Sequence, residues 1–100
     1  MALASGRPKQ FVGLHFFNPV QLMRLVEVIK TDHTDPAVFD AVAAFGKAIG
    51  KTTVTCKDTP GFIVNRLLIP YLTQAMAMVD RNDASVADID ISMQLGAGHP

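Results

Sequence analysis

The sequence changes character once, at Lys57-Asp58-Thr59-Pro60-Gly61, and this break limits what the chain can fold into. Adjacent proline and glycine end regular structure and favour a turn. Before the break, short apolar and β-branched runs are typical of strands, whereas after it apolar residues recur at helical spacing. The pattern predicts an α/β part followed by an all-α part, with a domain boundary after Asp58.

The first part predicts the order strand, strand, helix, strand. The nearly continuous apolar run from Phe11 to Phe17 is typical of a strand buried on both faces, and Leu25–Ile29 is a second strand. A helix is predicted to begin at Thr34-Asp35-Pro36, with a capping side chain before proline, and to end at Gly50. Thr52–Cys56 follows as a third strand. The apolar residues of the helix recur at helical spacing: Val38, Val42, Phe45 and Ile49.

The second part predicts a helix that is apolar on nearly all sides, over Phe62–Val79, and should therefore be buried on most sides. Ser85 and Asp88 form a capping-box pattern at the start of another helix. Covering the first helix would require more helices than the residues after Gly61 supply. We therefore expect the chain to be a fragment of a longer protein.

Charge and composition exclude several classes of function. Nine basic and nine acidic residues give zero net charge with interspersed signs, so neither nucleic acid nor an anionic membrane is an expected partner. No apolar run approaches the length of a membrane span. The single cysteine, Cys56, cannot form an internal disulfide, and no targeting signal is visible.

Neither a metal site nor a phosphate-binding loop can be identified in the sequence. The three histidines and the cysteine show no metal-ligand spacing, and no G-x-G-x-x-G pattern occurs. A metal site is therefore not expected in this chain.

His15 and Glu27 are the two polar residues inside the first two predicted strands. Taken separately, Glu27 is more often an exposed residue of an edge strand, and His15 is more often a hydrogen-bonded core residue. A symmetric antiparallel hairpin across residues 18–24 would place His15 directly opposite Glu27. The carboxylate would then fix the imidazole tautomer and leave the other nitrogen to accept a proton. The pattern predicts a general-base dyad, unless the register slips by one residue.

Asn65 is a polar amide in the first turns of the apolar helix. Such an asparagine often bonds a nearby backbone carbonyl. It could instead reach a substrate oxygen beside the histidine.

Several blocks of the sequence resemble the 3-hydroxyacyl-CoA dehydrogenase family, and they are closest to its short-chain, stand-alone members. The blocks run from Phe11 to Pro100: GLHFFNP at 13–19, LVEVI at 25–29, KDTPGFIVNR at 57–66, DID at 88–90 and LGAGHP at 95–100. Residues 1–10 do not match the block that normally precedes them, and we treat them as a leader.

The resemblance implies the fold and the chemistry. Residues 11–58 would be the C-terminal strands of a Rossmann-type NAD-binding domain, and residues 59–100 the truncated start of a helical dimerisation domain. The family oxidises (3S)-3-hydroxyacyl-CoA to 3-oxoacyl-CoA with NAD in fatty-acid β-oxidation. His15 matches the catalytic base, Glu27 the acid that orients it, Asn65 a substrate-binding residue and Asn18 a residue near the nicotinamide. The full-length protein is expected to be a homodimer in the mitochondrial matrix, or in the cytoplasm if bacterial.

The family features missing from these 100 residues leave alternatives open. The nucleotide-binding start and the later helices are missing, so we expect the chain by itself to bind NAD poorly and to be inactive. It could instead be a non-enzymatic truncated isoform or a crystallin-like structural relative. An independent interaction module is a third reading, because the apolar helix would offer a surface.

Overall fold

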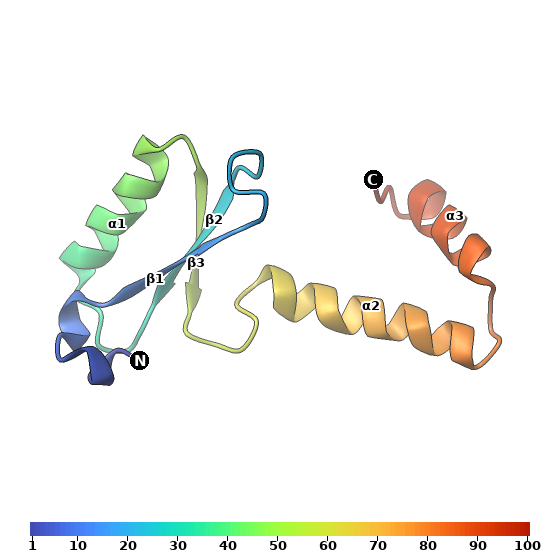
Figure 1. Cartoon of the computed structure of the whole chain (residues 1–100), viewed down its shortest axis with the longest axis horizontal. Coiled ribbons are helices and arrows are strands. Elements are labelled where there is room, and N and C mark those ends of the chain that lie inside the picture. The colour runs from blue at the N-terminus through green and yellow to red at the C-terminus, as the bar shows by residue number, and fades with distance from the viewer. The chain divides into compact units, whose positions relative to one another are not determined.

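The computed structural model describes residues 1–100, which form two compact units (Figure 1). The first unit, Met1–Ile63, contains two short 3-10 turns (Leu3–Ser5 and Pro8–Gln10), strands β1 (Val12–Phe16), β2 (Leu25–Lys30) and β3 (Thr52–Lys57), and helix α1 (Pro36–Ala48). The second unit, Val64–Pro100, contains α2 (Val64–Asp80) and α3 (Val86–Gly96). This order confirms the predicted α/β part followed by an all-α part.

Strand β2 is the centre of a three-stranded sheet in the order β1-β2-β3 (Figure 1). It pairs antiparallel with β1 and parallel with β3, and α1 is the crossover that a parallel pair requires. Because β2 has a neighbour on each side, its residues form the core: Val26, Val28 and Ile29 are buried. The β-branched run thus forms the interior strand, as its composition favours.

The start of α1 differs in one detail from the prediction. Pro36 is the first helical residue, and Gly50 follows the helix with φ +83°, as predicted. However, the Asp35 side chain makes no capping hydrogen bond, since its carboxylate is exposed to water. The Thr34 hydroxyl instead donates to the backbone oxygen of Phe11 at 2.7 Å, so it ties the start of β1 to the helix.

Helix α1 approaches β3 most closely at Gly46. A Cβ atom at Gly46 would lie 2.7 Å from Cγ2 of Thr53, so only glycine fits this contact. Of the four apolar residues at helical spacing, Val38 and Val42 are half-buried, whereas Phe45 and Ile49 are exposed.

Helix α2 begins at Val64 rather than Phe62, because Gly61 and Phe62 both adopt positive φ in a turn. None of its residues is buried, and Leu67 is 71% exposed. The predicted burial on most sides is therefore wrong for this chain, since its unit contains only one other helix. Helix α3 begins as predicted, with the Ser85 side chain accepting a hydrogen bond from the Asp88 amide.

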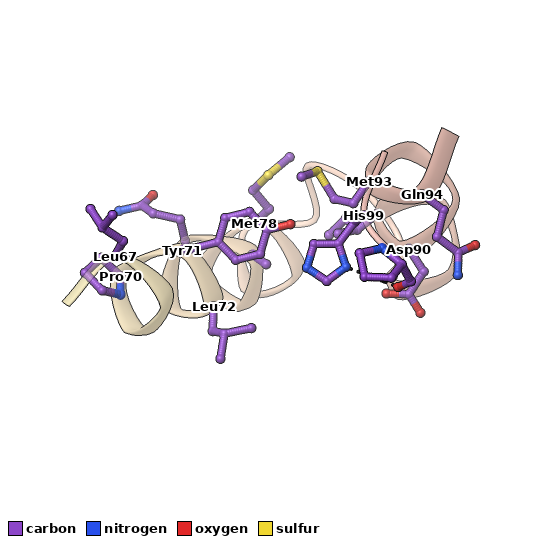
Figure 2. A pocket seen from close by; sticks show the side chains of 13 residues that line it. Leu67, Pro70, Tyr71, Leu72, Met78, Asp90, Met93, Gln94 and His99 are labelled. Carbon is purple, nitrogen blue, oxygen red and sulfur yellow. Dashed lines mark hydrogen bonds between the residues drawn. The ribbon is translucent and has the colours of Figure 1, made fainter. Parts of the chain in front are cut away.

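The second unit carries an open apolar groove of about 720 Å³, lined by α2, α3 and the C-terminal residues (Figure 2). The Tyr71 and His99 rings stack in it, nearly parallel, with centroids 5.9 Å apart. Leu67, Met78 and Met93 line the groove around this pair. None of the helices combines the length and apolar character needed to cross a bilayer.

Candidate active site

The antiparallel pairing of β1 and β2 places His15 directly opposite Glu27. Phe16 pairs with Val26 in the same register, which confirms the symmetric hairpin predicted from the sequence. Directly opposed residues of an antiparallel pair project from the same face of the sheet, so their side chains can meet. The strand pairing therefore brings the two candidate catalytic groups together.

The two side chains form a short hydrogen bond. His15 Nδ1 lies 2.6 Å from Glu27 Oε1. Glu27 is fully buried at 0% exposure, whereas the His15 side chain is 30% exposed. The reading of Glu27 as a solvated edge residue is thus wrong, because β2 is the central strand and Glu27 lies in its middle. His15 is hydrogen-bonded, as the reading of a core histidine expects, but its side chain keeps 30% of its surface exposed.

The buried carboxylate has partners on both oxygens. The backbone N–H of Ile63 donates to Glu27 Oε2 at 2.8 Å, while Oε1 faces the imidazole. A buried carboxylate without such donors would carry a large desolvation cost. The turn that follows β3 therefore completes the site by supplying a backbone donor to the ionised form of Glu27.

This arrangement determines which imidazole nitrogen is available for chemistry. An ionised carboxylate only accepts hydrogen bonds, so Nδ1 of His15 carries the proton that Oε1 accepts. In the neutral ring the lone pair is then on Nε2. A base in this state can accept a proton from an alcohol, and the neighbouring carboxylate stabilises the imidazolium that forms. The pair can act as a general-base dyad.

Two phenylalanine rings pack near the imidazole. The Phe17 ring centroid lies 4.8 Å from that of His15, and the Phe62 ring centroid lies 5.4 Å from it, both tilted. The sequence analysis missed both rings and the Ile63 amide. The position of Phe17, two residues after His15 along the extended chain, could have indicated its role. No side-chain pattern could have indicated a backbone donor at Ile63.

The two asparagines are not part of the dyad's hydrogen bonding. Asn18 is exposed in the loop that follows β1, three positions after His15 in the sequence, and it bonds neither His15 nor Glu27. Asn65 is exposed near the start of α2, in the second unit. Their predicted roles remain predictions.

No three histidine, cysteine, aspartate or glutamate side chains gather as a metal ion would require. The dyad has one histidine and one carboxylate, and that carboxylate already accepts the Ile63 amide.

The two units match two domains of one protein family. The profile described as "3-hydroxyacyl-CoA dehydrogenase, NAD binding domain" matches residues 1–59, and the one described as "3-hydroxyacyl-CoA dehydrogenase, C-terminal domain" matches residues 61–100. The chain belongs to the 3-hydroxyacyl-CoA dehydrogenase family. The first match begins at residue 1, so it includes residues 1–10, which the sequence reading had set apart as a leader.

Curated members of the dehydrogenase family match over the whole chain. The human mitochondrial hydroxyacyl-coenzyme A dehydrogenase is 58% identical over 100 residues, which are 100% of this chain and 32% of the relative. The 3-hydroxybutyryl-CoA dehydrogenase of Clostridioides difficile is 44% identical over 100% of this chain and 36% of the relative. The chain thus spans about a third of the length of the curated relatives it matches.

Solved structures of dehydrogenases share the fold. FadB2 of M. tuberculosis matches with a TM-score of 0.94 and 43% identity, over 99% of this chain and 35% of that one. The (S)-3-hydroxybutyryl-CoA dehydrogenase PaaH1 of Ralstonia eutropha matches with a TM-score of 0.96 and 42% identity, over the same shares. The first unit therefore has the strands of a Rossmann-type domain, and the second has the family's helical fold.

Proposed function

We propose that this chain supplies the catalytic base and its orienting carboxylate to an enzyme that oxidises (3S)-3-hydroxyacyl-CoA to 3-oxoacyl-CoA with NAD, in fatty-acid β-oxidation. The observation that carries the proposal is the 2.6 Å contact between His15 Nδ1 and the fully buried Glu27 carboxylate. It lies within the region that matches the family's NAD binding domain. The names of the relatives supply the substrate class.

The dyad would act on the 3-hydroxyl group of the substrate. His15 Nε2 accepts the hydroxyl proton as the C3–H bond breaks, and the new C=O bond forms from the O–H electron pair. The hydrogen on C3 leaves as a hydride, with both electrons of the C3–H bond, and bound NAD would accept it. Glu27 stays ionised and stabilises the charge that His15 gains, because the Nδ1 proton remains shared with Oε1. Ile63 holds the second carboxylate oxygen in place throughout.

The chain's own residues fit a nicotinamide cofactor at one point. Asn18 is a short, exposed amide in the loop directly after β1, so it can offer both a donor and an acceptor to the carboxamide of a nicotinamide. We assign Asn18 to the cofactor and Asn65 to the substrate. The side-chain amide of Asn65 can donate a hydrogen bond to a substrate oxygen, and it makes no hydrogen bond to another side chain of this protein.

The proposal extends to the assembly and the compartment of the full-length protein. The relatives at 56–58% identity over the whole chain are mitochondrial enzymes from human, pig, mouse and rat, whereas the bacterial ones are 44–46% identical. We place the full-length protein in the mitochondrial matrix. We also infer that the full-length protein is a homodimer, as the resemblance to the family implies. The second unit exposes large apolar residues that either the rest of the protein or a second subunit would cover: Leu67, Ile69, Leu72 and Met76. Subcellular fractionation and light scattering of the full-length protein test these two statements.

A chimera provides the direct test of the activity. Residues 1–100 replace the matching 100 residues of the human mitochondrial relative, and NADH formation is followed with a 3-hydroxyacyl-CoA substrate. We expect the chimera to turn over, and the His15→Gln variant to lose about 10²–10⁴-fold in kcat, as removal of a general base does. His33→Gln is the matched control, since His33 is exposed and bonds through its backbone only.

Two results would contradict the proposal. A folded chimera without turnover would favour the non-enzymatic, crystallin-like reading of the chain. Turnover that survives in the His15→Gln variant would show that another group removes the proton.

A further inference from the structure

The turn that precedes α2 has an unusual backbone. Gly61 and Phe62 adopt φ +78° and +50°, and the Phe62 amide donates to the Thr59 carbonyl to close the turn. Glycine takes this left-handed conformation freely, but a bulky aromatic residue does so at an energetic cost. A phenylalanine held there indicates that its side chain makes contacts that offset the strain.

Phe62 and its neighbour Ile63 both contact the dyad. The Phe62 ring packs against the His15 imidazole, with centroids 5.4 Å apart and planes tilted by 57°. The next residue, Ile63, donates its amide to Glu27 Oε2. Two consecutive residues of one turn therefore touch both members of the dyad, one through its side chain and the other through its backbone.

The hydrogen bond to Glu27 does not by itself fix the orientation of the His15 imidazole, so a packing contact is needed to hold the ring. The hydrogen bond fixes the distance between Nδ1 and Oε1, but the ring can still rotate about that bond and about its own side-chain torsions. His15 lies on β1, an edge strand, and its side chain is part-exposed, so the sheet covers only part of it. Aromatic rings at 4.8 and 5.4 Å restrict this rotation sterically and through edge-to-face contact.

We propose that Phe62 is a positioning residue, which uses its strained backbone to hold the imidazole so that Nε2 faces the substrate. This inference rests on the proposed dehydrogenase function. Phe17 contributes a second ring, but it lies directly after β1 and two residues from His15. Phe62, in contrast, lies 47 positions after His15 in the sequence. Phe62 therefore couples the geometry of the base to the folding of the turn at residues 59–63.

The test separates positioning from mere packing. Phe62→Gly removes the ring and tolerates the positive φ, so the turn can keep its shape while the imidazole loses its neighbour. Phe62→Tyr restores the ring, and Phe62→Leu is a second ring-free variant that keeps apolar bulk. Phe45→Leu is the control, because it removes an exposed phenylalanine on α1, away from the dyad. All are made in the human-relative chimera, so that each is measured in a complete enzyme.

Two readouts report on the orientation of the base. We expect Phe62→Gly to lower kcat about tenfold with an unchanged KM, since misplacing a catalytic group affects the transition state more than substrate binding. Nitrogen-15 spectra of labelled histidine should show one sharp set of His15 ring signals in the parent and line broadening from exchange between ring orientations in Phe62→Gly. Phe62→Tyr should restore both readouts, and Phe45→Leu should change neither.

The outcomes are distinguishable from failure of the dehydrogenase proposal. If Phe62→Gly and Phe62→Leu keep the parent kcat and the single set of sharp His15 ring signals while His15→Gln is inactive, the positioning role is wrong and the dyad stands. If Phe62→Gly does not fold, Phe62→Leu decides the question by the same two readouts. If His15→Gln retains turnover, the proposed function itself fails, whatever Phe62 does.

Discussion

Replacing Glu27 with glutamine tests the dyad most directly, because it changes one oxygen to an amide nitrogen at nearly constant volume. In its fully buried position, Glu27 accepts hydrogen bonds from His15 Nδ1 at 2.6 Å and from the Ile63 amide at 2.8 Å. Glutamine offers one accepting oxygen and one donating NH₂ group. The Ile63 amide can only donate, so it requires the oxygen. The NH₂ group then faces His15.

The consequence is a change of tautomer. An NH₂ group opposite Nδ1 requires Nδ1 to accept, so the imidazole proton moves to Nε2. Nε2 then carries no lone pair and cannot take the hydroxyl proton. A wrong tautomer held by a neighbouring amide removes most of the contribution of a general base, which predicts a fall in kcat of about 10²–10⁴-fold. This corresponds to about 3–5 kcal/mol of transition-state stabilisation.

The assay is steady-state NADH formation by the chimera with the human relative, with kcat and KM determined separately. Asp35→Asn is the matched acid-to-amide control, since Asp35 is exposed and its side chain makes no capping hydrogen bond. It should leave kcat unchanged. Thermal denaturation checks that Glu27→Gln still folds. A folded Glu27→Gln variant with the parent kcat would refute the claim that Glu27 determines the state of His15.

Three further predictions concern the scaffold. Gly46→Ala should destabilise the first unit by about 1–3 kcal/mol in urea denaturation, because the new methyl group would overlap Thr53, and the added substitution Thr53→Ser should recover part of the loss. Ser85→Ala should destabilise the second unit by about 1 kcal/mol in thermal denaturation, since it removes the cap on the Asp88 amide; Ser85→Thr should not. Leu67→Glu should reduce self-association in light scattering without lowering helix content by circular dichroism, because Leu67 is exposed.

The register of the dyad could be predicted because the information is local. A short loop joins β1 to β2, so the two apolar runs must pair as neighbours, and a symmetric hairpin leaves one register for His15 and Glu27. The end of α1 could also be predicted from the sequence, since Gly50 adopts the positive φ that often follows the last turn of a helix.

The partners of the dyad could not be predicted because they come from distant residues or from the backbone. Ile63 is 36 positions after Glu27, and its contribution is an N–H group that every residue except proline carries. Phe62 looked like part of the following helix, because its apolar side chain continues the helical pattern of α2. Its positive φ shows that tertiary contacts with His15 override that local preference.

The two strands divide the requirements of a general base between them. The acid must be desolvated to hold the imidazole strongly, and the central strand β2 provides this at Glu27. The base must be reachable by substrate, and the edge strand β1 leaves the His15 side chain part-exposed. Exchanging the two residues would place the imidazole in the core and the carboxylate near water, where it interacts more weakly with its partner. The position of each residue within the sheet is therefore as important to the chemistry as its identity.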